Sequence, residues 1–467
     1  MQDGLGLRQR AFGCRERQET EEAFGWIQKA AALLPQDPVT AFGHAQLAFE
    51  TGRPAAGLFE KAARLDPSNL QISHNHAAAL VQEGQTDRAI GLVEENLIRH
   101  PDWLAGHALL SKIRTICGHP IGANYANACA RQPTNMGLHL AWFQLMALAK
   151  NWDKAREILD LAKARMGETQ GLIMSRLFLA SQIELEQSKP DLSRDLFVGY
   201  DHWHDPGFDL CRVRYFLRRG EIERAAFFAN RHLQSQTQSL FLPYLSLIWR
   251  LNDDPKAHWL DRGSQLIKTI EIALMPDDLA NLAQVLRDLH KAKSPYLEQS
   301  VHGGTQTDGQ ILFHHDPAIQ VIRGRITTAV KGYLDALPPQ ELGHPLLGCA
   351  RGPIAFAGSW SVWLMSKGFH STHTHPQGVI SSAFYVDLPS TENLGSPPAG
   401  WLELGAPPPN LNLSLPAYTH IEPKPGRLVL FPSTQWHATK PFQTGERLTI
   451  AFDVTLPQIP KPDNTPI

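Results

Sequence analysis

The chain has 467 residues, of which 43% are hydrophobic and 19% charged, and its formal net charge is −2. This composition is typical of a globular protein of two to four domains, and it has no basic surplus for binding nucleic acid. The N-terminus lacks an apolar segment, and the apolar run 240–249 has about half the length of a membrane span, so we expect neither a secretion signal nor membrane insertion. The scattered cysteines favour a reducing, cytoplasmic location.

Residues 20–270 contain a degenerate repeat with a period of about 34 residues. Each of three segments has a turn glycine, apolar residues at helical spacing and a closing proline: 47–67, 79–101 and 112–133. The turn glycines recur after 32, 34 and 102 residues, the last being three times 34: Gly52, Gly84, Gly118 and Gly220. Further turns of this period are expected without a glycine, at 150–155, 187–192 and 251–257.

This helix–turn–helix period resembles the tetratricopeptide repeat, in about seven degenerate units. The resemblance implies an all-α solenoid in which stacked hairpins bury their apolar faces and leave a concave groove. We expect a protein or peptide partner in that groove. The alternatives are that the repeats only pack against the domain that follows, or that they form a homodimer.

Three His-x-His pairs occur in the chain: His74/His76, His202/His204 and His373/His375. The first two fall in segments that we expect to be helical. Residues i and i+2 of a helix point about 200° apart, so these pairs cannot share a metal ion. We interpret them as ordinary histidines.

From residue 276 the pattern changes, and we expect two parts, 1–275 and 276–467. Helices are predicted at 277–292 and 317–337. After these, β-branched and aromatic segments between Gly/Pro-rich turns predict strands: 358–366, 378–389, 400–404, 426–432 and 447–456. Short strands at this spacing favour an antiparallel sandwich or barrel, so the whole chain is expected to be an α+β multidomain protein.

The third histidine pair lies at the start of a predicted strand. In extended backbone, residues i and i+2 project to the same face, so His373 and His375 can reach one ion. His437 follows 62 residues after His375, in "FPSTQWHATKPF". Imidazoles suit Fe, Cu and Zn, so the three histidines are candidate metal ligands.

The last predicted strand carries a second set of polar side chains. Arg447, Thr449, Ala451 and Asp453 share one face of it, by the period of two. The planar guanidinium of Arg447 suits a carboxylate, and the Thr449 hydroxyl can join it. A metal beside a carboxylate clamp is what a chelating keto acid needs.

Residues 294–454 resemble the Fe(II)/2-oxoglutarate-dependent oxygenases, and more narrowly a bacterial branch of them. The matching segments are 297–309, 373–389, 423–442 and 445–453. The resemblance implies a double-stranded β-helix (jelly-roll) core with Fe(II) held by His373 and His437, and 2-oxoglutarate held by Arg447 with Thr449. It also implies that O2 is consumed, 2-oxoglutarate is decarboxylated to succinate, and a substrate C–H bond is hydroxylated.

The sequence departs from the usual His-x-Asp/Glu motif of this superfamily, because the third position is His375. We favour His375 itself as the third ligand, since the strand period brings it to the same face as His373. The alternative is a carboxylate from elsewhere, with Asp387 and Glu403 nearest along the strands.

Four further residues are candidates around this site. Tyr385 is a candidate for a hydrogen bond to 2-oxoglutarate, with a core tyrosine as the alternative. Gln306 and Thr307, in a Gly-rich turn between helix and sheet, are candidates for contacting the substrate. Trp360 and Trp363 point to opposite faces of their strand, so at most one faces the site, and Trp363 is the candidate for substrate contact.

The sequence thus predicts a 2-oxoglutarate-dependent dioxygenase, a hydroxylase, whose repeats select a protein or peptide substrate. Two other functions stay open. One is a non-catalytic repeat adaptor with a degenerate oxygenase module. The other is a three-His metal dioxygenase independent of 2-oxoglutarate, in which Arg447 binds a substrate carboxylate.

Overall fold

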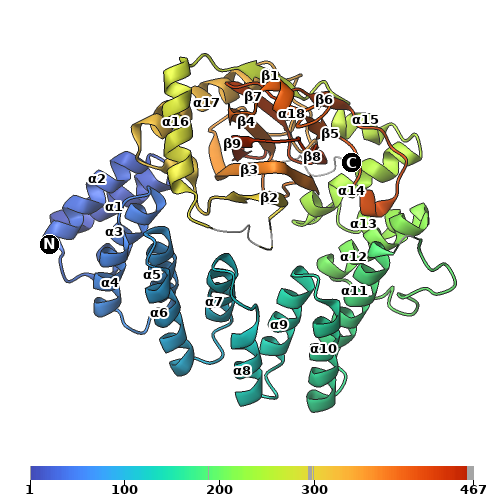
Figure 1. Cartoon of the computed structure of the whole chain (residues 1–467), viewed down its shortest axis with the longest axis horizontal. Coiled ribbons are helices and arrows are strands. Elements are labelled where there is room, and N and C mark those ends of the chain that lie inside the picture. The colour runs from blue at the N-terminus through green and yellow to red at the C-terminus, as the bar shows by residue number, and fades with distance from the viewer. Residues whose placement is uncertain (1, 188, 293–296, 298, 460–467) are drawn as a thin grey trace.

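The computed structural model describes residues 2–187, 189–292, 297 and 299–459. The N-terminal part consists of helices that stack in antiparallel pairs along an arc (Figure 1). These helices are α1 (Gln2–Glu16), α2 (Thr20–Leu33), α3 (Pro38–Glu50), α4 (Ala56–Leu65), α5 (Leu70–Gln82), α6 (Thr86–Arg99), α7 (Leu104–Ile116), α8 (Ala123–Arg131), α9 (Met136–Leu148), α10 (Trp152–Met166), α11 (Gln170–Glu186), α12 (Pro206–Arg219), α13 (Ile222–Asn230), α14 (Gln238–Leu251) and α15 (Lys256–Asp261). The predicted all-α repeat region is confirmed.

At the predicted turns, a residue in the left-handed backbone conformation follows the first helix of each pair. The four glycines have φ angles of 69°, 75°, 77° and 76°: Gly52, Gly84, Gly118 and Gly220. Lys150, between α9 and α10, and Asp253, between α14 and α15, have φ angles of 55° and 52°. The turn geometry therefore persists at two predicted turns that lack glycine. The third, 187–192, includes residue 188, which lies outside the described residues.

The two histidine pairs of the repeats lie in different local structures. His74 and His76 lie in α5, as predicted. The helical prediction for His202 and His204 is wrong, because both are exposed in the turn segment between α11 and α12. The segment carries Gly199 at a φ of 86° and Pro206 at the first position of α12, which favour a turn over a continuous helix.

The C-terminal part is built on an antiparallel sheet, which confirms the predicted jelly-roll class. Within the described residues its strand order is β1-β7-β4-β9-β3-β8-β5-β6, with β2 beside β3. The strands are β1 (Lys268–Glu271), β2 (Val301–Gln306), β3 (Ala355–His373), β4 (Ile380–Asp387), β5 (Leu402–Leu404), β6 (Thr419–Ile421), β7 (Arg427–Pro432), β8 (His437–Thr439) and β9 (Glu446–Thr455).

Some strands lie in segments for which no strand was predicted. β1 pairs with β7 although it precedes the expected boundary at residue 275, which itself stays a prediction. β2 replaces the predicted turn around Gln306 and pairs with β3. A Cβ on Gly304 would lie 2.3 Å from the carbonyl oxygen of Trp363, so the glycine lets the two backbones approach.

Helices cover one face of the sheet, and a cavity lies on the other face. The remaining helical elements are α16 (Pro276–Leu289), η1 (Ile311–Phe313), α17 (Pro317–Asp335), α18 (Thr391–Leu394) and η2 (Pro409–Leu411). The apolar side chains of α16 and α17 form one core with alternate residues of β9: Leu448, Ile450, Phe452 and Val454. The other residues of β9, from Arg447 to Asp453, line a cavity, so the predicted alternation of this strand is confirmed.

Both ends of the helical arc contact the sheet part (Figure 1). Near the N-terminus, the Gln18 side chain exchanges hydrogen bonds of 2.9 and 2.8 Å with the backbone of Phe356. Near α14, the indole of Trp436 donates to the Pro243 carbonyl at 3.0 Å. The middle of the arc reaches the sheet part through an ion pair of 2.9 Å between Lys112 and Asp308. Within the described residues, no helix is long and apolar enough to cross a membrane.

Candidate metal centre

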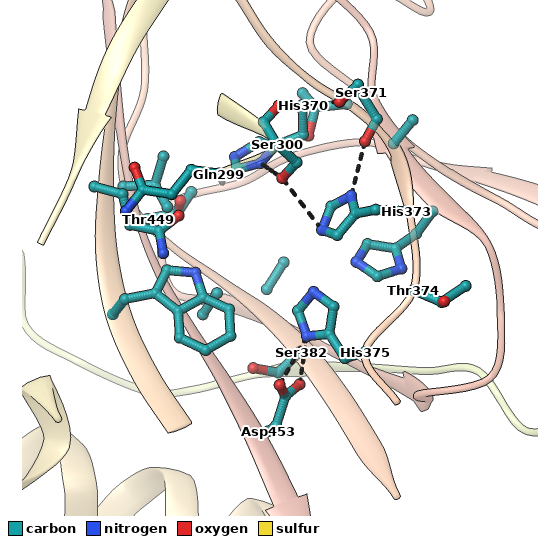
Figure 2. A pocket seen from close by; sticks show the side chains of 18 of the residues that line it. Gln299, Ser300, His370, Ser371, His373, Thr374, His375, Ser382, Thr449 and Asp453 are labelled. Carbon is teal, nitrogen blue, oxygen red and sulfur yellow. Dashed lines mark hydrogen bonds and ion pairs between the residues drawn. The ribbon is translucent and has the colours of Figure 1, made fainter. Parts of the chain in front are cut away.

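The open face of the sheet encloses a cavity of about 800 Å³. Its lining comes from strands distant in sequence, from β2 to β9, and Lys112 of α7 joins from the repeats. Figure 2 shows that His373 and His375 point toward each other within it. The cavity is therefore a product of strand pairing across the whole C-terminal part.

Four histidines line this cavity, and three of them, all except His370, come close enough together to share an ion. His373 ends β3 and faces His437 of β8 in the antiparallel register. His375 comes from the β3–β4 connection rather than from a strand, which differs from the prediction. The ring centres lie 4.2 Å apart for His373 and His437, and 5.0 Å for each pair with His375. Their nitrogen ligand atoms all lie within 4.8 Å of one another, as a single metal ion requires.

Hydrogen bonds orient all three rings in the same way. The Nδ1–H of His373 donates to the Ser371 carbonyl at 2.7 Å, and that of His437 to the Gln435 carbonyl at 3.1 Å. The Nδ1–H of His375 donates to the carboxylate of Asp453 at 2.7 and 2.8 Å. Because a carbonyl or carboxylate oxygen only accepts, each Nδ1 carries a proton, and the neutral form of such a ring keeps its lone pair on Nε2. Three Nε2 atoms thus face a candidate metal position, and that of His373 is also 3.4 Å from the Ser300 hydroxyl.

The site keeps these imidazoles in the form that binds metal. Burial, with a smaller effect of neighbouring His375, lowers the pKa of His373 to about 3. Burial, followed by the neighbouring histidines, lowers the pKa of His437 well below its ordinary value. Both rings are therefore neutral at physiological pH, and no proton has to leave before a cation binds.

Arg447 and Thr449 lie in the same cavity, as predicted. Arg447 is 3% exposed, donates to the Gly400 carbonyl at 2.8 Å, and has no carboxylate partner among the described residues. Burial lowers its pKa, yet a guanidinium stays charged. Its Nε is buried without a hydrogen-bond partner in the described part of the chain. This guanidinium fits the carboxylate of a keto acid.

Tyr385 stands behind Arg447 rather than in the cavity wall. Its ring centre lies 4.9 Å from the guanidinium carbon, and its side chain is fully buried. Burial raises the pKa of its hydroxyl, which stays protonated. Tyr385 therefore supports the position of Arg447, and the predicted hydrogen bond to 2-oxoglutarate stays a prediction.

The predicted substrate residues are divided between two cavities and one core. Gln306 lines both the metal cavity and a neighbouring cavity of about 510 Å³, and Thr307 lines only the neighbouring one. Trp363 is on the opposite face of β3, where it donates to Glu446 at 3.0 Å and packs against His290. The tryptophan that lines the site is Trp360, whose ring centre lies 5.4 Å from that of His375. This placement corrects the choice of Trp363.

The alternative carboxylate ligands are engaged elsewhere. Asp387 pairs with Arg287, and Glu403 pairs with Lys440 at 2.7 Å, and neither lines the cavity. The carboxylate beside the histidines is Asp453, which the sequence places on the correct face of β9 but to which it assigns no role; Asp308 also lines the cavity and pairs with Lys112. The signal that could have found it is its spacing of two, four and six residues from the other inward residues of that strand.

The fold and site define a helical-repeat protein whose jelly-roll sheet carries a three-histidine candidate metal centre. Residues 358–453 match the model of a family described as "Putative 2OG-Fe(II) oxygenase". The match contains the three histidines, Arg447 and Asp453. No curated protein matches the chain.

Solved structures resemble each part separately. A prolyl-4-hydroxylase from Pseudomonas putida is 17% identical, with 44% of this chain and 96% of that one covered at a TM-score of 0.30. A tetratricopeptide repeat protein from Parabacteroides merdae is 16% identical, with 50% and 92% covered at 0.29. A 2OG-Fe(II) oxygenase family oxidoreductase from Burkholderia pseudomallei is 12% identical, with 44% and 93% covered at 0.27. Because these TM-scores are low, the proposals below rest on the site and on the matched family model.

Proposed function

We propose that this protein is an Fe(II)- and 2-oxoglutarate-dependent oxygenase that hydroxylates a protein or peptide substrate selected by the helical repeats. The observation that carries the proposal is that three histidine ligand atoms lie close together in one cavity with a buried Arg447, which has no carboxylate partner among the described residues. The matched family model supports the same reaction class.

The residues present fit the group that the proposal requires. When bound, iron with 2-oxoglutarate and O2 supplies the oxidising chemistry that hydroxylates a C–H bond. His373, His375 and His437 would hold the metal through Nε2, each fixed by its Nδ1–H bond. Arg447 would pair with a carboxylate of 2-oxoglutarate, with the Thr449 hydroxyl on the same face of β9.

Two neighbouring cavities with shared lining residues support the proposal of a peptide substrate. The metal cavity and the neighbouring 510 Å³ cavity share Lys112, Gln306 and Asp308 in their linings. Apolar side chains of α5 and α7, among them Val81 and Leu109, line the second cavity. A chain with an apolar residue in the second cavity could therefore extend from the repeats to the histidines.

The first experiment is anaerobic visible absorption of the protein with Fe(II), before and after 2-oxoglutarate is added. A new charge-transfer band is expected, because the keto acid chelates the iron. Iron binding without a band would favour the three-His dioxygenase that needs no 2-oxoglutarate. Absence of iron binding would favour the repeat adaptor.

The role of the repeats has its own test. Peptide libraries are screened by mass spectrometry for the gain of one oxygen atom, and Val81→Arg is compared with wild type on the best substrate. We expect a raised KM with unchanged 2-oxoglutarate binding, since Val81 lines only the second cavity. Ile98→Arg, at an exposed residue of α6 outside both cavities, is the control. An unchanged KM for Val81→Arg would contradict substrate selection through this cavity.

A further inference from the structure

Two carboxylates line the metal cavity: Asp308, which pairs with Lys112, and Asp453, which is held against a histidine ligand. Both oxygens of Asp453 accept from the Nδ1–H of His375, at 2.7 and 2.8 Å. Asp453 is 7% exposed, and one of its oxygens also accepts from the Ser381 hydroxyl at 2.7 Å. Figure 2 shows the His375 ring between Asp453 and His373, so this carboxylate faces the back of the ligand and not the metal position.

The chain around Asp453 is built to keep this contact. His375 belongs to the β3–β4 connection, and its backbone N–H donates to the Ser433 carbonyl at 3.2 Å. Gly378 lets the connection lie this close: a Cβ there would come within 2.7 Å of the Ser433 hydroxyl and 3.0 Å of the Asp453 Cβ. Ser381 and Ser433 also share a hydrogen bond of 2.9 Å. The connection that carries His375 is thus packed directly on the carboxylate.

The contact bears on the missing carboxylate ligand. Two histidines and one carboxylate give the usual non-haem iron site one negative charge, which three neutral imidazoles lack. A carboxylate that accepts a ligand's Nδ1–H fixes the ring and makes its Nε2 a stronger donor. The negative charge is then on a carboxylate that is hydrogen-bonded to the ligand imidazole, and not on a carboxylate bound to the metal.

We propose that Asp453 is a positioning residue that supplies this negative charge through His375, so that the His375–Asp453 pair replaces the single carboxylate ligand. The inference rests on the proposed metal site. It is independent of which substrate is oxidised and of whether 2-oxoglutarate is the co-substrate.

The first test measures metal affinity and not activity. Anaerobic Fe(II) binding and Mn(II) binding by electron paramagnetic resonance are titrated for wild type and Asp453→Asn. The asparagine keeps the shape and an acceptor oxygen for the His375 Nδ1–H but removes the charge. We expect about 10–100-fold weaker binding. Asp387→Asn, which removes a carboxylate outside the cavity, is the matched control and should bind as wild type.

A charge exchange provides the second test. His375→Asp places a new carboxylate against that of Asp453, so we expect metal affinity to fall. His375→Asp combined with Asp453→Asn restores one carboxylate to the site, so its affinity should exceed that of the single variant. Circular dichroism and thermal melts verify that each variant is folded.

The outcomes separate the inference from the function beneath it. Wild-type affinity in folded Asp453→Asn, or a double variant no better than His375→Asp, would overturn the role of Asp453 while the metal site stands. A wild-type protein that binds neither Fe(II) nor Mn(II) would overturn the proposed function, and the inference with it.

Discussion

The helical repeats and the sheet use the same local pattern in different ways. His74/His76 of α5 and His202/His204 before α12 have the spacing of His373/His375. In the described residues, only the pair at the end of β3 belongs to a histidine cluster with metal-binding spacing. The difference lies in the partners: a repeat packs on its neighbours in the chain, whereas β3 pairs with β2, β8 and β9. Pairing over long sequence distances brings the third histidine to the other two.

The largest expected effect tests this difference directly. His437→Ala removes a ligand and should abolish Fe(II) binding, an effect beyond the roughly 10–100-fold expected for changes behind a ligand. His202→Ala combined with His204→Ala removes an equal pattern from the repeats and should leave metal content unchanged. Metal content measured after anaerobic loading and desalting decides between them. Equal metal content in His437→Ala and wild type would remove this histidine from the site.

A smaller loss of function is expected when the cavity keeps its metal but loses the guanidinium of Arg447. Arg447→Ala should weaken the binding of 2-oxoglutarate by about 2–5 kcal/mol, which is typical when one partner of a buried charge pair is truncated. Fe(II) binding should be retained. The measurement is a 2-oxoglutarate titration of the iron absorption band. Arg64→Ala, an exposed repeat residue that pairs with Glu60, is the control. Unaltered titration of Arg447→Ala would contradict the carboxylate role.

The stability of the contact between α15 and His344 of the C-terminal part should depend on pH. The His344 Nε2–H donates to the Leu260 carbonyl of α15 at 3.0 Å, and its Nδ1 accepts from the backbone N–H groups of Leu346 and Leu347. Burial lowers the pKa of His344 to about 4, below the value of about 6.5 in an unfolded chain. Between these values the unfolded chain binds the extra proton, so stability present above pH 6.5 is lost as pH falls toward 4.

This contribution is at most about 3 kcal/mol. Thermal melts of wild type and His344→Gln between pH 7 and pH 4.5 should show a weaker pH dependence in the variant, because glutamine does not titrate. His258→Gln changes an exposed histidine of α15 and is the control. If the melting temperatures of wild type and His344→Gln fell in parallel with pH, the contact of His344 with α15 would not be a source of acid sensitivity.

The smallest effect concerns the ion pair at the middle of the arc. Lys112 and Asp308 are 32% and 63% exposed in their side chains, and exposed pairs contribute about 0–1 kcal/mol. Asp308→Asn should therefore shift the melting midpoint only slightly in low salt, and less in high salt. A large shift would mean that this contact, rather than the two ends of the arc, holds the parts together.

The sequence alone predicted the features that depend on local spacing. The turn glycines and the apolar helical period predicted the repeats, and the same turn forms at Lys150 and Asp253. Alternation predicted the longer strands and the two faces of β9. The histidine and arginine spacing predicted the ligand candidates and Arg447, which the cavity brings together.

Only the tertiary structure decided how distant groups meet. Strands β1, β2, β6 and β8 are short and carry weak local signals, and β1, β2 and β8 form hydrogen bonds with strands far along the chain. The tertiary structure shows that Trp360 is on the face of β3 that lines the cavity. It also shows that the carboxylate beside His375 belongs to Asp453, and not to Asp387 or Glu403. Spacing fixes which side chains share a face of one strand. Which face is enclosed, and what lies behind a ligand, depends on the packing of segments that the sequence keeps apart.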